Sequence, residues 1–338
     1  MLNSPENPKL WLNAALGILF LSLNGCSSVD GVFSSFWDKD KSKEFLGTAA
    51  ETAKAAGENP EEPSTAAVSK LAEKAQGFVK SEVVDAASSL LPNWEIEISD
   101  GASSETQVGL STIRQLIKTD DIDNTVFWQG SASNRDSRTT VNLGVGYRHL
   151  SDDHRWLSGL NFFYDHEFPY NHQRASVGVE LKSSAFELTS NFYEAISGWE
   201  KGKASKQEHA LGGYDIEVGS QLPYIPSAKL FVKQFKWNAV QNASDLKGKA
   251  YSVAVDHVFG NGWSVEAGRR DYETGRDDDF VSLTYSIQTV GARNAGNNKP
   301  FFSDQMFETA SMENRRLDKV RRENKIVTQT AGFTVKFR

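Results

Sequence analysis

From Asn93 onward, apolar and polar positions alternate along the chain. The segment 138–150 reads RTTVNLGVGYRHL, and apolar or bulky side chains occupy every second position. Successive side chains of a strand point to opposite faces, so one face of this segment is apolar and the other is polar or glycine. Such a strand fits a soluble sandwich, and it also fits a strand between lipid and a water-filled lumen.

Eleven further segments share this period of two. Most have about ten residues, the length that a tilted strand needs to cross a bilayer. Besides 138–150, we expect strands at 93–99, 106–117, 124–133, 155–168, 173–184, 185–199, 212–223, 228–237, 249–259, 262–272 and 279–289.

Short and long connections between these segments tend to alternate, as in outer-membrane barrels, which have tight periplasmic turns and longer outer loops. Aromatic residues stand at several predicted strand ends, as in the aromatic girdles of membrane barrels. They are Trp94, Tyr147, Tyr164, Trp199 and Tyr285. These features favour an all-β fold, a transmembrane barrel of about twelve antiparallel strands over residues 92–290, over a soluble sandwich.

The N-terminal region predicts export. Residues 11–23 are largely apolar but too short for a comfortable spanning helix, which is typical of a signal peptide. Leu23-Asn24-Gly25-Cys26 follows and resembles a lipobox, so we predict a lipoprotein-type signal peptide over 1–25 and lipidation of Cys26. An ordinary signal peptide is the alternative. The single cysteine excludes an intramolecular disulfide.

Two segments separate this signal from the strands. Residues 26–63 are rich in Ser, Ala, Glu, Lys and Gly and predict a flexible linker. In residues 64–91, apolar positions recur at spacings of three and four, which predicts one periplasmic helix that ends before Pro92.

Composition removes several classes of protein. A mean hydropathy of −0.47 excludes a polytopic helical membrane protein but not a membrane barrel, in which every second strand residue faces water. The net charge of −7 argues against a nucleic-acid partner.

No motif predicts an enzyme or a cofactor site. The chain has neither GxSxG nor GxxxxGK[ST]. We read residues 152–154 (Asp-Asp-His) as a turn and residues 165–167 (Asp-His-Glu) as a loop edge, because neighbouring strand residues do not converge on a metal. We therefore expect no catalytic residue, no metal and no cofactor.

Several segments together resemble a known family. NLGVGYRHL, LSGLNFFYDHEFPYNHQRASVGVEL, LTSNFYEAISGW, GGYDIEVGSQLP and RRLDKVRRENKIV (315–327) are similar to the β-domain of inverse autotransporters, the intimin/invasin family. The resemblance implies a twelve-stranded outer-membrane barrel with a periplasmic N-terminus. It also implies that the chain returns through the pore to carry an adhesive passenger, usually immunoglobulin-like domains, to the cell surface. Only residues 328–338 follow Val327, so we expect a barrel without such a passenger.

The basic segment near the C-terminus has a physical interpretation of its own. We predict that residues 291–338 form a pore-threading linker and short tail, whose cations pair with acidic residues of the lumen. The pore-linker residues are Arg315, Arg316, Lys319, Arg321, Arg322 and Lys325. The predicted lumen-facing residues are Glu95, Glu97, Arg148, Glu180, Glu217 and Glu266. A solvated basic segment in the periplasm is the alternative.

These observations favour a non-enzymatic barrel of the bacterial outer membrane, an anchoring and translocation unit for surface display linked to adhesion. Its expected partners are outer-membrane lipids, the barrel-assembly machinery, and a separately encoded partner or a host-cell ligand. The alternatives are a gated channel plugged by its own tail, a periplasmic lipoprotein with a soluble β domain, and the product of a truncated gene.

Overall fold

The computed structural model describes residues 94–101, 104–117, 121–241, 243–257, 262–275, 277–287, 302–331 and 335–336. The predicted signal peptide, the lipidation site Cys26, the linker and the helix over 64–91 lie outside the described residues.

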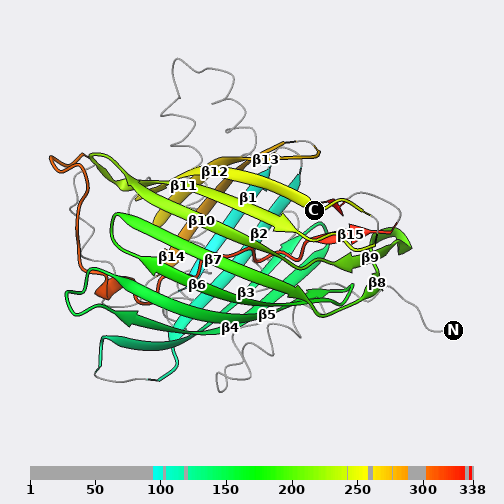
Figure 1. The fold of residues 1–338 in the computed structure, drawn as a ribbon, viewed down its shortest axis with the longest axis horizontal. Coiled ribbons are helices and arrows are strands. Elements are labelled where there is room, and N and C mark those ends of the chain that lie inside the picture. The colour runs from blue at the N-terminus through cyan, green and yellow to red at the C-terminus, as the bar shows by residue number, and fades with distance from the viewer. Residues whose placement is uncertain are drawn as a thin grey trace, which may run out of the picture. The chain divides into compact units, whose positions relative to one another are not determined.

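Twelve antiparallel strands close into a barrel (Figure 1). They are β1 (Trp94–Gly101), β2 (Ser104–Gln115), β3 (Asn124–Arg135), β4 (Arg138–Leu150), β5 (Leu157–Phe168), β6 (His172–Lys182), β7 (Phe186–Ala195), β10 (Gly213–Leu222), β11 (Ile225–Trp237), β12 (Leu246–Asp256), β13 (Trp263–Tyr272) and β14 (Asp278–Ile287). Each pairs with its neighbours along the chain, and β1 closes the ring against β14, from Trp94 opposite Ile287 to Gly101 opposite Phe280. The predicted all-β barrel is confirmed.

Burial on the two faces of the wall is inverted relative to a water-soluble protein. On β4, Leu143, Val145 and Tyr147 are 43–49% exposed, whereas Asn142 and Arg148 on the other face are at most 1% exposed. Exposed apolar side chains recur on the outer face of β5, β6, β10 and β11. A closed barrel with an apolar outside and a polar inside is the arrangement that a lipid bilayer stabilises.

The strands match the predicted segments within a few residues at most ends, but two expectations were wrong. The segment 185–199 is one strand only to Ala195, since Trp199 belongs to a separate short strand. Short and long connections alternate from β1 to β12, but the predicted placing of the short ones at one end fails, because they change ends at β6. In the first half of the barrel, the connections 102–103, 136–137 and 169–171 are the short ones, and 116–123 and 151–156 at the opposite end are longer.

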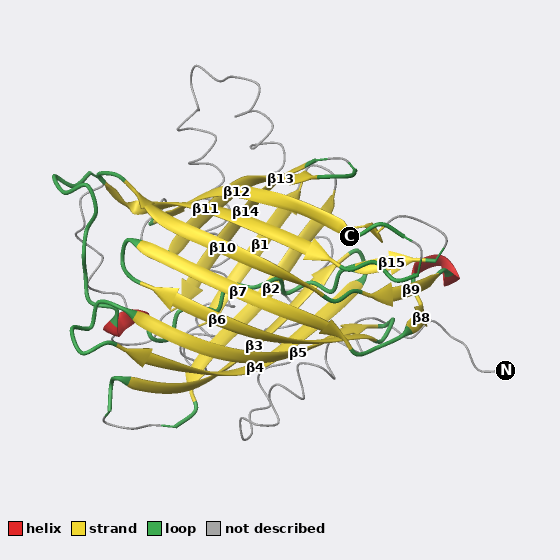
Figure 2. Ribbon diagram, viewed as in Figure 1, coloured by secondary structure: helices red, strands yellow, loops and turns green. Residues whose placement is uncertain are grey.

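A second, four-stranded sheet lies outside the ring of the barrel (Figure 2). Its order is β16 (Val335–Lys336), β15 (Thr328–Thr330), β9 (Gln207–Ala210) and β8 (Trp199–Lys201). Two 3-10 turns, η1 (Lys203–Ser205) and η3 (Glu313–Arg315), complete the described elements. None of the helices in the described ranges is long and apolar enough to span a membrane.

Candidate functional site: the occupied lumen

After β14, the chain enters the barrel at one end and leaves it at the other (Figure 1). We call residues 312–331 the tail. At the inlet end, Met312 N–H donates to the carbonyl of His154 between β4 and β5 (2.7 Å). At the outlet end, Leu211 N–H donates to the carbonyl of Val327 (2.9 Å), and β15 then pairs with β9, with Thr328 opposite Ala210. The tail therefore runs the length of the lumen.

Lumen side chains of the wall satisfy the tail's backbone. Between η3 and β15 the tail has no regular structure, so its peptide groups need other partners, because an unpaired buried N–H or C=O is costly. The wall donors and acceptors are Gln129 to Val320 N–H (2.9 Å), Tyr193 to Glu323 N–H (2.7 Å), Arg148 to the Arg316 carbonyl (2.8 Å), Arg174 to the Glu323 carbonyl (2.6 Å), Asn142 to the Asn324 carbonyl (2.9 Å) and Asn191 to the Arg321 carbonyl (3.1 Å). The wall thus binds the tail's backbone as well as its side chains.

The most deeply buried contact joins two arginines to one aspartate. Both terminal nitrogens of Arg322 reach Asp165, at 2.9 and 2.7 Å, and Arg322 also donates to Ser176 (2.9 Å). Arg174 reaches the same carboxylate from β6 (2.8 Å). The side chains of all three charged residues are 0% exposed. A bidentate Arg–carboxylate pair fixes both position and orientation, so it sets the register of the tail in the pore.

Four arginines in the lumen each stack on a phenylalanine ring that lies flat against a glycine. In each case a glycine faces a phenylalanine on the neighbouring strand, and a guanidinium lies over the ring. The sets are Gly144, Phe163 and Arg322 (4.4 Å from guanidinium carbon to ring centre), Gly146, Phe127 and Arg148 (4.6 Å), Gly219, Phe231 and Arg321 (3.8 Å), and Gly268, Phe280 and Arg270 (4.1 Å). A Cβ at any of these glycines would overlap the ring, so glycine is what lets the ring lie flat beneath the cation.

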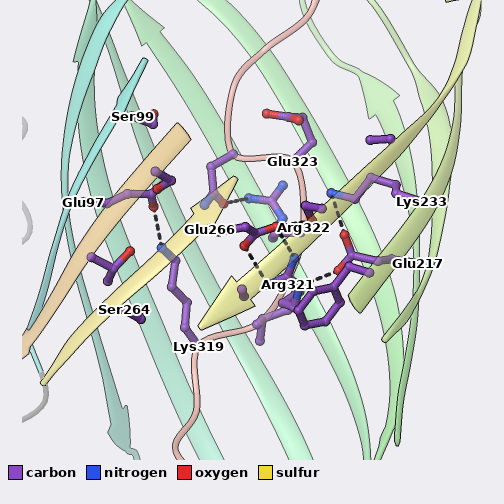
Figure 3. Close-up of a pocket in the computed structure, with 18 of the residues that line it drawn as sticks. Glu97, Ser99, Glu217, Lys233, Ser264, Glu266, Lys319, Arg321, Arg322 and Glu323 are labelled. Carbon is purple, nitrogen blue, oxygen red and sulfur yellow. Dashed lines mark hydrogen bonds and ion pairs between the residues drawn. The ribbon is translucent and has the colours of Figure 1, made fainter. Parts of the chain in front are cut away.

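Beside the tail, a cavity of about 350 Å³ remains along β1 and β10–β14 (Figure 3). Arg321 crosses to this side, where it pairs with Glu217 and with Glu266 (3.1 Å). Lys319 pairs with Glu97 (3.0 Å), and Lys233 of β11 shares Glu217 (3.3 Å). These pairs hold the tail from the side opposite Asp165.

At the inlet end, Arg315 pairs with Glu187 (2.9 Å) and with Asp318 of its own segment (2.6 Å). Arg316 has no carboxylate partner among the described residues and donates instead to the carbonyls of Ile122 (3.0 Å) and Glu313 (2.9 Å). The inlet contacts are thus a mixture of ion pairs and carbonyl hydrogen bonds.

The structure brings only part of the predicted set of pairs together. Glu97, Glu217 and Glu266 contact tail cations, as just described. Glu180 pairs instead with Arg148 (2.5 Å) and Lys182 (2.6 Å), and the Glu95 carboxylate accepts from the Ser286 hydroxyl (3.3 Å). The Lys325 amine lines the cavity without an ion pair to any described residue.

Two important acids were missed from the sequence, Asp165 and Glu187. The interpretation of residues 165–167 as a loop edge was wrong, since they lie inside β5, with Asp165 and Glu167 facing inward. The predicted strand 155–168 already contained these residues, and its alternation places Asp165 and Glu167 in the lumen; Glu187 follows in the same way from the alternation of β7. Residues 152–154 do form a turn. In the described ranges, no group of three or more His, Cys, Asp or Glu is placed to hold a metal ion.

An ionic cluster at the outlet end fastens β9 to the barrel rim. Arg138 of β4 bridges Glu167 and Glu208, at 2.7 Å each, and His172 lies 3.5 Å from Glu208. Burial alone would raise the pKa of Glu208, but the contacts with His172 and Arg138 outweigh it and lower the pKa to about 2. The Glu208 carboxylate is therefore ionised at neutral pH.

An apolar layer covers the same end of the lumen. It is formed by Tyr193, Leu211, Phe235, Trp237, Leu246 and Val327. Val327 belongs to the tail and Leu211 precedes β10, so the tail itself completes this layer. The cavity is consequently polar along its length and bordered by apolar side chains at the outlet.

Comparisons with known proteins agree with this geometry. Residues 48–324 match the family model "Inverse autotransporter, beta-domain". The inverse autotransporter adhesin YeeJ of Escherichia coli K12 is 26% identical over 216 residues, covering 61% of this chain and 9% of that protein. Invasin of Yersinia enterocolitica is 27% identical over 202 residues, covering 55% of this chain and 23% of that protein.

A solved structure from a study of in-meso crystallization of membrane proteins aligns with a TM-score of 0.59. It is 20% identical and covers 70% of this chain and 99% of that one, which shows the shared fold. The chain spans only a small part of the curated relatives, 9% and 23% of their lengths.

Proposed function

Because the chain belongs to the inverse autotransporter β-domain family and lies in the bacterial outer membrane, we propose that its barrel anchors and translocates its own C-terminal segment. In this role the barrel is not an enzyme: it holds the tail in the lumen and presents the residues beyond Val327 at the cell surface, in the service of adhesion. The observation that carries the proposal is the continuous path of residues 312–331 from the inlet to the outlet, fixed by Arg322 on Asp165.

The proposal includes an orientation. We place the inlet end in the periplasm and the outlet end, with β8, β9 and β15, at the cell surface. Residues 92–290 then form the anchor and 291–338 the threaded segment. The periplasmic extension over 26–91, lipidated at Cys26 after removal of residues 1–25, belongs to the same proposal, as do the barrel-assembly machinery and a surface ligand as partners.

Thiol labelling in intact cells tests the orientation. Lys201 in β8 and Asp152 between β4 and β5 are exposed at opposite ends of the barrel. With a membrane-impermeant maleimide, Lys201→Cys should react in intact cells, and Asp152→Cys should react only after the outer membrane is permeabilised. The parent chain, whose one cysteine is Cys26, is the control. The reverse pattern would overturn the orientation.

The cavity supports a second candidate, a channel that the tail plugs. If the tail is the plug, charge reversal of Arg321 and Arg322 to Glu should expel it from an acidic lumen and raise single-channel conductance in planar bilayers. The same double change to Lys, which keeps the charge, should raise it much less. Equal conductance of the parent and the Glu variant would remove the plug from the proposal.

A further inference from the structure

The outward surface near the outlet end is not uniform around the barrel. Residues 250, 252 and 254 of β12 line the cavity, as do every second residue of β11 from Lys229 to Trp237. The residues between them therefore face outward. On β11 and β12 these outward positions carry a lysine patch near the outlet, formed by Lys236, Lys247 and Lys249. On β5 and β10, the outward positions near the same end carry Tyr164, His166 and Tyr214 instead.

Strand register places the three lysines on one small surface. Lys236 lies directly opposite Lys247, and Lys249 is the next outward residue of β12. Like charges opposite each other across a strand pair are destabilising unless a counter-charge is present. Asp245 supplies one, pairing directly with Lys236 (3.1 Å) and attracting Lys247 at longer range, but the amines of Lys247 and Lys249 have no direct ion pair or hydrogen bond within the described part of the chain.

Neighbouring acids are already engaged. On β13, Arg269 is the next outward cation, and it holds three aspartates. These are Asp271 (2.9 Å), Asp277 (2.9 Å) and Asp279 (3.4 Å). Asp271 is also the register partner of Lys249, but its carboxylate is held by Arg269. The amines of Lys247 and Lys249 are therefore open to an anion from outside the described chain.

An apolar strip adjoins the lysine patch on the side toward the middle of the barrel. Val232 faces Tyr251, and Leu230 faces Val253, one and two outward rows below Lys249. All four side chains are 37–41% exposed. The surface thus offers hydrocarbon contact and, within roughly 7 Å along the strand, two cations. A ligand that matches this surface is an amphiphile whose acyl chains contact the apolar strip and whose phosphate, at the boundary with water, contacts the lysines.

We propose that the lysine patch and the apolar strip bind a phosphorylated glycolipid of the outer leaflet, the lipid A type. Its phosphate lies between Lys247 and Lys249, and its acyl chains lie along Val232, Tyr251 and Val253. The outlet end must face the cell surface for this lipid to reach the patch, so the inference rests on the proposed orientation.

Binding of lipid A to the purified full chain in detergent tests the inference without reference to orientation. The patch variant is Lys247→Gln with Lys249→Gln. Its matched control is Lys201→Gln with Lys206→Gln, which removes two exposed lysines from the loop that carries β8 and β9. Each cation near an anionic headgroup contributes about a fivefold factor, so the patch variant should bind on the order of twentyfold more weakly, and the control should bind like the parent.

Two further arms identify the source of the affinity. Lys247→Arg with Lys249→Arg should retain binding, and dephosphorylated lipid A should bind parent and patch variant equally. Equal binding of phosphorylated lipid A by the parent and the patch variant would overturn the inference, as would a preference of the patch for phosphatidylethanolamine vesicles. Failure of the thiol-labelling pattern in cells would instead overturn the orientation and leave the detergent result intact.

Discussion

Asp165→Asn should be the most damaging single change at the contact between tail and wall, more damaging than removal of the tail arginine itself. The reason is that two arginines share one carboxylate. Asp165 is the one carboxylate that Arg174 and Arg322 share, and all three side chains are 0% exposed. Asparagine keeps the shape but leaves two buried guanidiniums facing each other without the carboxylate that they share, which costs about 3–5 kcal/mol.

Two other variants set the scale. Arg322→Gln leaves Asp165 paired with Arg174, so it loses charge-assisted hydrogen bonds worth about 1.5–3 kcal/mol. Lys319→Gln breaks a pair whose side chains are 22% and 32% exposed, and exposed pairs contribute about 1 kcal/mol or less. The double variant Asp165→Asn with Arg322→Gln should be less damaged than Asp165→Asn alone, since it buries one unpaired cation instead of two.

The position of the tail can be measured directly. Lys325 lines the cavity without an ion pair to any described residue, so replacing it should disturb the tail little. Lys325→Cys, in a chain that also carries Cys26→Ser, then provides one thiol whose reactivity reports whether the tail is inside the lumen. A bulky polyethylene glycol maleimide reaches it only when the tail leaves the lumen. At about 1.4 kcal/mol per tenfold, Asp165→Asn should raise the labelling rate by roughly two to three and a half powers of ten, and Lys319→Gln by about fivefold at most. Easier release of the tail by Arg322→Gln than by Asp165→Asn would refute the role of Asp165 as the shared counter-charge.

Two other predictions follow from the lumen and the rim. Gly219→Ala should lift the Phe231 ring from beneath Arg321 and increase maleimide labelling at residue 325. Gly109→Ala is the control and should not increase labelling, because an added Cβ there stays 3.6 Å from its nearest neighbour. Equal labelling of the two variants would show that the glycine–phenyl contact does not hold the tail. Glu208 has its pKa lowered to about 2 from an ordinary value of 4.5, so its contribution to holding β9 is complete above about pH 4.5 and is lost as the pH falls through 2. Hydrogen exchange of β9 and β15 should therefore accelerate over this range relative to Glu208→Gln at the same pH, and parallel curves for the two proteins would exclude Glu208 as the sensitive group.

The strands could be predicted from sequence because their signal is local. A period of two needs only the neighbouring residues to be read, and the bilayer fixes the strand length, so segments such as 138–150 were located to the residue. The loops alternate in length over most of the barrel, but the short ones lie at one end before β6 and at the other end after it, because loop length is not constrained by the wall.

The pairing of charges was harder to predict because it depends on register between strands. Arg148 and Glu180 belong to different strands and meet across Gly159, which lies between them in register on β5 and leaves the space that their side chains fill. No local sequence pattern indicates that Glu180 is paired with a cation of the wall and is therefore not available to the tail. In the same way, Asp165 becomes the central acid only because register sets it beside Arg174 and Asn142.

The charge of the cavity leads to a final prediction about the emptied barrel. Among the described residues that line the cavity, the wall supplies seven carboxylates and four cations, whereas the tail supplies five cations and two carboxylates. The tail therefore neutralises this side of the wall, and a barrel that lacks residues 302–338 should carry an excess of negative charge along the cavity. Because a charged lumen concentrates counter-ions, such a barrel should select cations over anions in a KCl gradient across a planar bilayer. Glu217→Gln with Glu266→Gln in the same shortened chain should reduce the reversal potential toward zero. An anion-selective pore would mean that the wall, and not the tail, supplies the excess of cations.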